Sequence, residues 1–297
     1  MPIRNLILPL LFITVLSVQS FAHEKNKHNN CDSTKSWDWD EFKSEFENWH
    51  KKGKPAISFD YGFSQMNLKG INSSFAKPNM LELKIGHTRE TPLDDSEEIL
   101  KYRFTNVFLS YISTELSNKT NMDGLRSNLW RFGVSWRKGY GYNFGNSSII
   151  LYNSGSFMWS KLDLKDFPVN QEDKDKLDRF NKSFRFGTSA EEGIKIKLIP
   201  LISVQAGYER AIIFERHLFW KWLGSEVIYF AGQGALDAFI NEIKDTSPIA
   251  VPVVNFILKG ALSYGMYQLR QEKMNWPFNT APPLAYDQFK FGVTFIF

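Results

Sequence analysis

A two-residue alternation of apolar and polar side chains restricts the possible folds of this sequence more than any other feature. Successive side chains of a strand point to opposite faces, so this period predicts strands with one apolar and one polar face. The alternation is plainest in the last nine residues, where bulky apolar residues occupy every second position. Eight segments are predicted strands on this basis: 57–64, 81–86, 102–114, 130–137, 148–159, 184–198, 202–209 and 289–297.

Two of these segments, 102–114 and 148–159, are less regular, because both faces carry apolar residues. A β-bulge within each strand is one explanation, since an extra residue shifts the phase. The alternation itself has two physical solutions. The aromatic face is the core of a soluble sandwich, or it meets lipid around a barrel whose polar face lines the lumen.

The amino terminus reads as a cleaved export signal. Residues 1–22 combine a basic start at Arg4, an apolar stretch and a small residue at Ala22, and that stretch is short for a bilayer span. The following segment, 23–54, contains a predicted amphipathic helix, Ser36–Lys52, which lies either in a membrane interface or on the protein's own end. The single cysteine, Cys31, excludes an intrachain disulfide.

The context favours a membrane barrel over a sandwich. Several segments reach roughly ten residues, the length of a tilted membrane-spanning strand, and the chain ends on the apolar side chain of Phe297. Aromatic residues also lie at strand ends, where the interfacial girdles of such barrels occur. They include Tyr140, Tyr142, Trp159 and Tyr286.

The export signal and the closing run 289–297 resemble those of bacterial outer-membrane β-barrel proteins. The resemblance implies an antiparallel transmembrane barrel of about eight strands in the bacterial outer membrane. A terminal Phe297 after alternating apolar residues is similar to the signal that the barrel-assembly machinery recognises, so that machinery is an expected partner. Outer-membrane lipid and lipopolysaccharide are the other expected partners, whereas a net charge of +4 is too small to indicate nucleic acid.

The predicted organisation is a barrel interrupted by helices. Strands one to seven fall within 55–214 and the last strand within 287–297, and an even strand count predicts short joints after strands two, four and six. The segment 90–101 is long for such a joint.

The insertion 215–286 has helical periodicity and a break near Pro248, which predicts a hairpin. We expect this hairpin to plug or cap the barrel; the alternatives are a position on or in the outer leaflet beside the barrel, or in the periplasm if the topology is inverted.

The polar faces of the predicted strands carry charges that would point into the lumen. An eight-stranded barrel is only just wide enough to be filled by side chains, so these groups are expected to pair rather than line a pore. The candidate lumen charges are Asp60, Glu82, Lys84, Arg131, Arg137, Arg185, Glu191, Lys195, Glu209 and Lys290, with Gln205 among them.

Few residues suggest chemistry. Ser225 and His217 are eight residues apart and are the only candidates for a nucleophile and base of a lipid-modifying enzyme. Arg210, Arg216 and Lys221 are candidates for binding an anionic headgroup, with anchoring of the hairpin as the alternative role. No metal site or cofactor is expected.

Three functions remain open: a structural or envelope-assembly barrel, a lipid or lipopolysaccharide-modifying enzyme, and a narrow transporter gated by the hairpin.

Overall fold

The computed structural model describes residues 53–93, 96–117, 123–166 and 170–297. The predicted export signal 1–22, Cys31 and the predicted helix Ser36–Lys52 lie outside this part of the chain.

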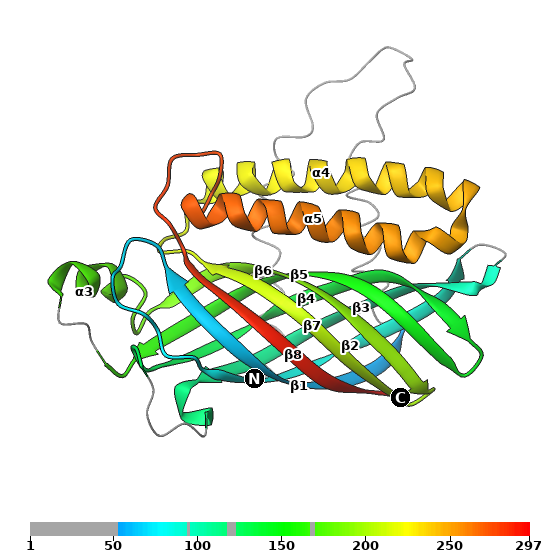
Figure 1. Ribbon diagram of the computed structural model, residues 1–297, viewed down its shortest axis with the longest axis horizontal. Helices are drawn as coiled ribbons and strands as arrows, with labels where there is room; N and C mark the ends of the chain where they lie inside the picture. The colour runs from blue at the N-terminus through cyan, green and yellow to red at the C-terminus, as the bar shows by residue number, and fades with distance from the viewer. Residues whose placement is uncertain (1–52, 94–95, 118–122, 167–169) are drawn as a thin grey trace, which may run out of the picture. The chain divides into compact units, whose positions relative to one another are not determined.

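Eight antiparallel strands form a closed barrel in which each pairs with its neighbours in sequence and β1 pairs with β8 (Figure 1). The fold class and the strand count predicted from the alternation are therefore confirmed. The strands are β1 (Lys54–Leu68), β2 (Asn79–Leu93), β3 (Ser96–Ser113), β4 (Ser127–Phe144), β5 (Ser147–Leu164), β6 (Phe184–Ile199), β7 (Ile202–Ile213) and β8 (Leu284–Ile296).

The joints between strands distinguish the two ends of the barrel. At the turn end, where β1 begins and β8 ends, the joints are 94–95, 145–146 and 200–201. Gly145 has a φ of 73°, a left-handed conformation that glycine adopts without steric cost, and it allows β4 to reverse into β5 within two residues. The predicted short joints after strands two, four and six are confirmed, because the segment 90–101 belongs mostly to long strands rather than to a loop.

At the opposite end, the loop end, longer segments join the strands. They contain a 3₁₀ turn, η1 (Thr114–Leu116), and a short helix, α3 (Gln171–Asp178). The fourth long joint, between β7 and β8, holds helix α4 (Phe219–Thr246), the 3₁₀ turn η2 (Pro248–Ala250) and helix α5 (Val251–Glu272).

The two irregular segments contain no bulge. The register of β3 against β4 and of β4 against β5 is continuous. Both faces of these segments are apolar because the inward face also carries apolar side chains. Phe104, Phe108, Tyr152 and Met158 point into the barrel interior and are buried there. The phase of the alternation is therefore constant.

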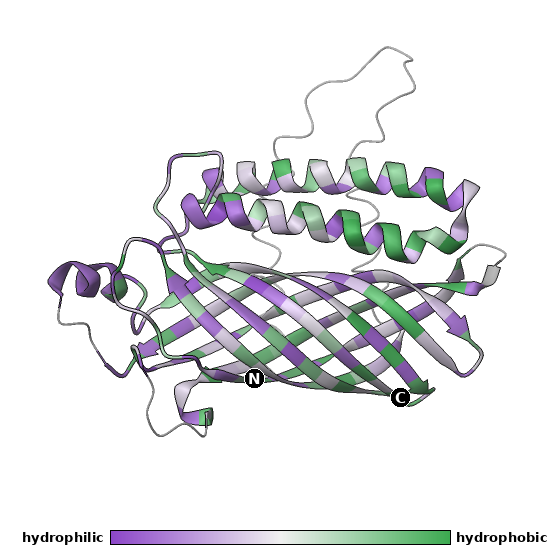
Figure 2. Ribbon diagram, in the orientation of Figure 1, coloured by the Kyte–Doolittle hydropathy of each residue, from purple (hydrophilic) through white to green (hydrophobic). Residues whose placement is uncertain are grey.

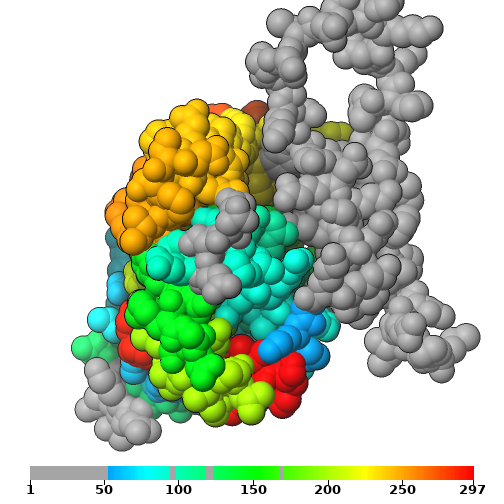
Figure 3. All heavy atoms as spheres, turned by 90° about the vertical axis from the view of Figure 1, so that its right-hand side faces the viewer, coloured from blue at the N-terminus to red at the C-terminus, as the bar shows by residue number. Residues whose placement is uncertain are grey.

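The helical hairpin lies against the outside of the barrel. Helix α5 contacts β4, β5, β6 and β7, and α4 packs on α5 away from the wall (Figure 1). Viewed onto the turn end, the hairpin turn lies beside the ring of strands and not over it (Figure 3). The expectation that the hairpin plugs or caps the barrel is therefore wrong. The interior is already filled by side chains of the strands, so the apolar helices are packed on the wall instead.

The interior at the loop end supplies a stability test. Leu129 is completely buried in an apolar cluster inside the barrel, whereas Leu81, on the outer face, is half exposed. Leu129→Ala is expected to reduce the free energy of unfolding by about 2–5 kcal/mol because a cavity remains. Leu81→Ala leaves no internal cavity and is expected to cost less. Denaturant unfolding of the folded protein measures both, and equal losses would contradict this description of the interior.

Candidate functional site

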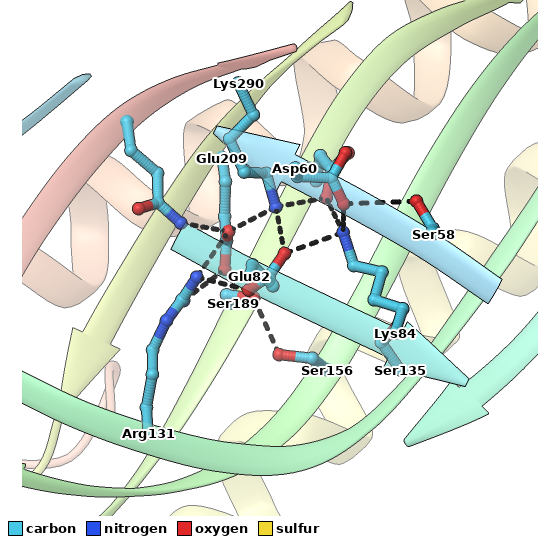
Figure 4. A network of polar contacts seen from close by, with 12 residues as sticks. Ser58, Asp60, Glu82, Lys84, Arg131, Ser135, Ser156, Ser189, Glu209 and Lys290 are labelled. Carbon is cyan, nitrogen blue, oxygen red and sulfur yellow. Dashed lines mark hydrogen bonds and ion pairs between the residues drawn. The ribbon is translucent and has the colours of Figure 1, made fainter. Parts of the chain in front are cut away.

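The barrel interior holds the charges predicted from the polar faces of the strands. They come from different strands and meet near the middle of the lumen (Figure 4). All of the predicted lumen charges except Arg185, which is half-buried near the start of β6, are almost fully buried. The buried ones are Asp60, Glu82, Lys84, Arg131, Arg137, Glu191, Lys195, Glu209 and Lys290.

Arg131 is the central cation of this network. Its Nη2 lies 2.6 Å from Glu82 Oε2, and its Nη1 lies 2.8 Å from Glu209 Oε1. It also donates to the hydroxyl of Tyr286. Because Glu82 is on β2 and Glu209 on β7, the guanidinium of Arg131 on β4 connects three strands across the lumen. A guanidinium suits this position because its fork of donors can satisfy two carboxylates at once.

A second group forms around Glu191. Its carboxylate accepts from Arg137 Nη2 at 2.9 Å, from the Tyr152 hydroxyl at 2.7 Å and from Lys290 Nζ at 2.7 Å. The Arg137 guanidinium carbon also lies 4.6 Å from the centre of the Tyr152 ring, a cation–π contact. Gly193 and Gly207 make room for Tyr152, since a Cβ on either would lie within 3 Å of its hydroxyl oxygen.

Lys290 and Lys84 join these groups into one network. Lys290 Nζ lies 2.6 Å from Glu209 and 3.2 Å from Glu82. Lys84 Nζ lies 2.7 Å from Glu82 and 2.8 Å from Asp60 (Figure 4). The network therefore balances the carboxylates of Asp60, Glu82, Glu191 and Glu209 with the cations of Lys84, Arg131, Arg137 and Lys290. Such pairing is what makes burial of these charges tolerable.

Apolar layers close the lumen on both sides of the network. Toward the loop end, Met80, Ile112 and Leu129 are completely buried, and Phe75 and Leu177 from the joining segments pack into the same cluster. Toward the turn end, a second buried cluster contains Ala56, Tyr102, Phe104, Ile150, Tyr152 and Ile296. The described side chains thus fill the interior from one end to the other, as expected for a barrel of this size.

The loop end is held shut by a buried carboxylate. Asp173 of α3 accepts hydrogen bonds from the backbone N–H of Asn72 at 3.0 Å, the N–H of Ser73 at 2.9 Å and the Ser73 hydroxyl at 2.8 Å. Burial by itself raises the pKa of Asp173, but these hydrogen bonds outweigh it and lower the pKa below the ordinary value of 3.8. The segment 69–78 is thereby fixed to α3 over the mouth of the barrel.

No hydrogen bond joins the two catalytic candidates among the residues that the structure describes. Ser225 is buried between α4 and α5, and its Oγ accepts from Arg270 Nη2 at 3.0 Å. The ring of His217 instead packs among aromatic rings, 5.0 Å from Phe186 and 5.5 Å from Trp222, centre to centre. In the described part of the chain, no group of three His, Cys, Asp or Glu residues is arranged to hold a metal ion.

The three headgroup candidates separate as well. Arg210 is mostly buried against α5 and pairs with Glu192, so its charge is directed toward the hairpin. Arg216 is exposed in the linker before α4. Lys221 is exposed in the first turn of α4, and its Nζ donates to the carbonyl oxygen of Asn279 at 3.1 Å. The alternative role, anchoring of the hairpin, fits the mostly buried Arg210, whereas the exposed Lys221 is compatible with either role.

Sequence reasoning missed two sets of residues. Tyr152 and Gln288 complete the lumen network, and they resemble the surrounding apolar and polar residues too closely to be singled out. Tyr286 also belongs to the network, so the expectation that it lies in an interfacial girdle is wrong: its side chain is buried and its hydroxyl accepts from Arg131 inside the lumen. Glu90 was assigned to a turn, but it extends β2 and pairs with Lys195 at 3.1 Å and Lys197 at 2.7 Å. The second set consists of polar residues on the apolar face of the strands beneath the hairpin; their position on the wrong parity was the available signal. They are Asn153, Glu192 and Asp287, which lie near the candidate Arg210.

Comparison with known proteins gives remote structural similarities. No protein-family model and no curated protein sequence matches the chain. Among solved structures, the neisserial surface protein A (NspA) is similar at a TM-score of 0.38 and 11% identity, covering 82% of this chain and 97% of that one. Ail, the attachment invasion locus protein of Yersinia pestis, is similar at a TM-score of 0.31 and 8% identity, covering 83% and 99%. At such identities and TM-scores the two similarities support no further conclusion about this chain.

The lumen network predicts a large effect of removing its central cation. Arg131→Met leaves Glu82 and Glu209 buried without their shared partner, so we expect a loss of about 3–5 kcal/mol in the free energy of unfolding. The exposed pair Arg126–Asp166 is the matched control, and Arg126→Met is expected to cost no more than about 1 kcal/mol. Adding Glu209→Gln to Arg131→Met should lose less than the sum of the single losses, and strict additivity would contradict the network.

The contact of Asp173 predicts a pH dependence. Because its pKa is lower in the folded state, its contribution to stability is fully present above the ordinary value of 3.8 and is lost as the pH falls through the folded value. The difference in unfolding free energy between wild type and Asp173→Asn should be constant above about pH 5 and shrink in acid. Asp178→Asn, an exposed change in the same helix, is the control. A difference that persists unchanged in strong acid would disprove this role.

Proposed function

We propose that the protein is an integral barrel of the bacterial outer membrane with a sealed lumen and a structural or envelope-assembly role. One observation carries the proposal: the barrel is charged inside and apolar outside. Lipid acyl chains can contact such an apolar outer face, whereas exposing it to water is unfavourable in free energy. Large apolar side chains are exposed on every strand, including Phe59, Leu81, Val107, Trp130, Trp159, Phe184, Tyr208 and Phe291.

The arrangement of joints supports an orientation. Barrels of this class have short periplasmic turns and longer external loops. The turn end, with both ends of the barrel domain, would then be periplasmic, and the loop end with α3 would face outward. An export signal at 1–22 agrees with this location and stays a prediction from the sequence.

The exposed cations at the loop end support contact with outer-membrane lipid. Arg216 and Lys221 flank Trp220, whose side chain is strongly exposed. Cations beside an indole suit the boundary between phosphorylated headgroups, including those of lipopolysaccharide, and acyl chains. The barrel-assembly machinery is the other proposed partner, through β8 and the terminal Phe297.

The two alternative functions have less support. In a transporter gated by the hairpin, the hairpin would have to block the lumen. Here the lumen is filled by side chains of the barrel, and the hairpin lies outside it. An enzyme built on Ser225 and His217 needs a base within reach of the hydroxyl, and the described neighbours of Ser225 include Arg270 and not His217.

Fractionation and gel mobility test the location. The protein should be found in outer-membrane fractions and migrate differently in gels before and after heating, because a folded barrel resists detergent. It should also leave the conductance of a planar bilayer unchanged. Mature protein that stays monomeric in buffer without detergent, or that opens stable conductance steps, would refute the proposal.

A pair of substitutions tests contact with lipid by depth. Phe291 lies near the middle of β8 on the outer face, and Leu201 lies in the turn between β6 and β7. Phe291→Arg is expected to lose about 2–4 kcal/mol in lipid vesicles, and Leu201→Arg about 0–1 kcal/mol, because the cost of a cation falls toward the interface. Reversible unfolding in vesicles measures both. Equal losses at the two positions would contradict a membrane-embedded barrel.

A further inference from the structure

The hairpin follows the wall of the barrel over its height. Its two feet join β7 and β8 at the loop end, and its turn lies near the turn end, where the Tyr142 hydroxyl donates to the carbonyl oxygen of Ile249 at 2.8 Å. Between these points, both helices run along the barrel (Figure 1). The hairpin therefore covers the same range of depth as the strands.

A series of polar contacts fixes α5 to the wall. Glu192 and Arg210 form an ion pair beneath the helix, and the Arg210 guanidinium lies 5.3 Å from the centre of the Tyr264 ring. The Tyr267 hydroxyl donates to Asp287 Oδ1 at 2.7 Å. These wall residues occupy the apolar parity of their strands, which elsewhere carries exposed aromatic and aliphatic side chains. The wall beneath α5 thus carries polar groups among apolar side chains such as Ile99 and Ile212, which also pack against the hairpin.

The opposite side of the hairpin is apolar and exposed. Figure 2 shows hydrophobic residues in both helices, mostly toward the hairpin turn, interspersed with polar ones. The segment Pro248–Glu272 is long and apolar enough to cross a membrane. Exposed apolar side chains on the two helices are Val227, Ile228, Phe239, Val253 and Ile257.

Charges within the helices are confined to pairs or to the ends. Near the feet, Glu226 pairs with Arg270 of the last turn of α5 at 3.0 Å. In the middle of the hairpin, Asp237, whose side chain is 56% exposed, pairs with Lys259 at 2.5 Å. Each pair joins α4 to α5, so neither helix presents an isolated charge there. The remaining charges lie in terminal turns, at Lys221 and Glu272 by the feet and at Glu242, Lys244 and Asp245 by the turn.

This distribution matches the thickness of a bilayer. Helix α5 has 22 residues and is about 33 Å long, close to the roughly 30 Å of a hydrocarbon core. Helix α4 has 28 residues and is about 42 Å long, so its charged last turn can reach beyond that core. An unpaired charge is costly in hydrocarbon, so charges inside a membrane are usually paired. In water an isolated charge carries no such cost, so a water-exposed hairpin would tolerate isolated charges at its centre.

We infer that α4 and α5 cross the outer membrane beside the barrel, as two membrane-spanning helices docked on its wall. Their outer face contacts lipid acyl chains, and the hairpin turn emerges on the periplasmic side. This inference rests on the proposed location of the barrel, but adds that the lipid-facing surface is part strand and part helix.

Single cysteines in a Cys31→Ser background test the inference in lipid nanodiscs, which expose both membrane faces. Ile257→Cys reports the middle of α5, Ile249→Cys the hairpin turn and Phe291→Cys the barrel wall. We expect a membrane-impermeant maleimide to react at Ile249→Cys and at least about tenfold more slowly at the other two positions, because the reactive thiolate does not form in hydrocarbon. A bimane label attached at Ile257→Cys before folding should be quenched by lipids with brominated acyl chains.

The outcomes separate the two proposals. Protection at Phe291→Cys with rapid reaction at Ile257→Cys would overturn the spanning hairpin and leave the membrane barrel intact. Rapid reaction at both positions in the folded protein would overturn both. Protection at Ile249→Cys would show a hairpin that enters the bilayer without crossing it, and protection at Ile257→Cys without quenching would show a protein partner in place of lipid. Each of these last two results also overturns the inference.

Discussion

Closure of eight strands into one hydrogen-bonded ring is the constraint on which the rest of this structure depends. The ring satisfies the backbone of every strand and leaves no edge. It also fixes which side chains point inward, because inward and outward residues alternate along each strand. An eight-stranded ring has too little internal space for a water channel, so every inward side chain must find a partner within the lumen.

The interior meets most of this demand in layers; among the described residues, Arg137 Nη1 and the hydroxyls of Ser110, Ser148 and Ser203 are buried without a hydrogen-bond partner. The balanced network around Arg131, Glu191 and Lys290 satisfies the charges in the middle, and apolar clusters fill the space on either side. Charged groups that connect β2, β4, β6, β7 and β8 across the lumen hold the strands together in a way that apolar packing alone does not specify. The same filling leaves no space for the hairpin inside.

The hairpin is accommodated by a local exception to the alternation. Where α5 packs, the outward positions carry Asn153, Glu192, Arg210 and Asp287, and these residues bind the helix. Elsewhere the outward positions keep their exposed apolar side chains. The outer face of the barrel therefore contacts the helix pair over one part of its circumference and the proposed lipid over the rest.

The sequence by itself determined the eight strands and the set of inward charges, because a period of two is a local property of the chain. The joint between β2 and β3 did not fit the expected pattern until the structure showed that both strands extend into it. The sequence also indicated two helices between β7 and β8. Only the tertiary structure decided that these helices lie outside the barrel, that Ser225 meets Arg270 and not His217, and that Arg210 faces α5. These outcomes depend on which surfaces remain unfilled after the ring has closed. Periodicity specifies the face on which a side chain lies, but not the distant segment that will cover it.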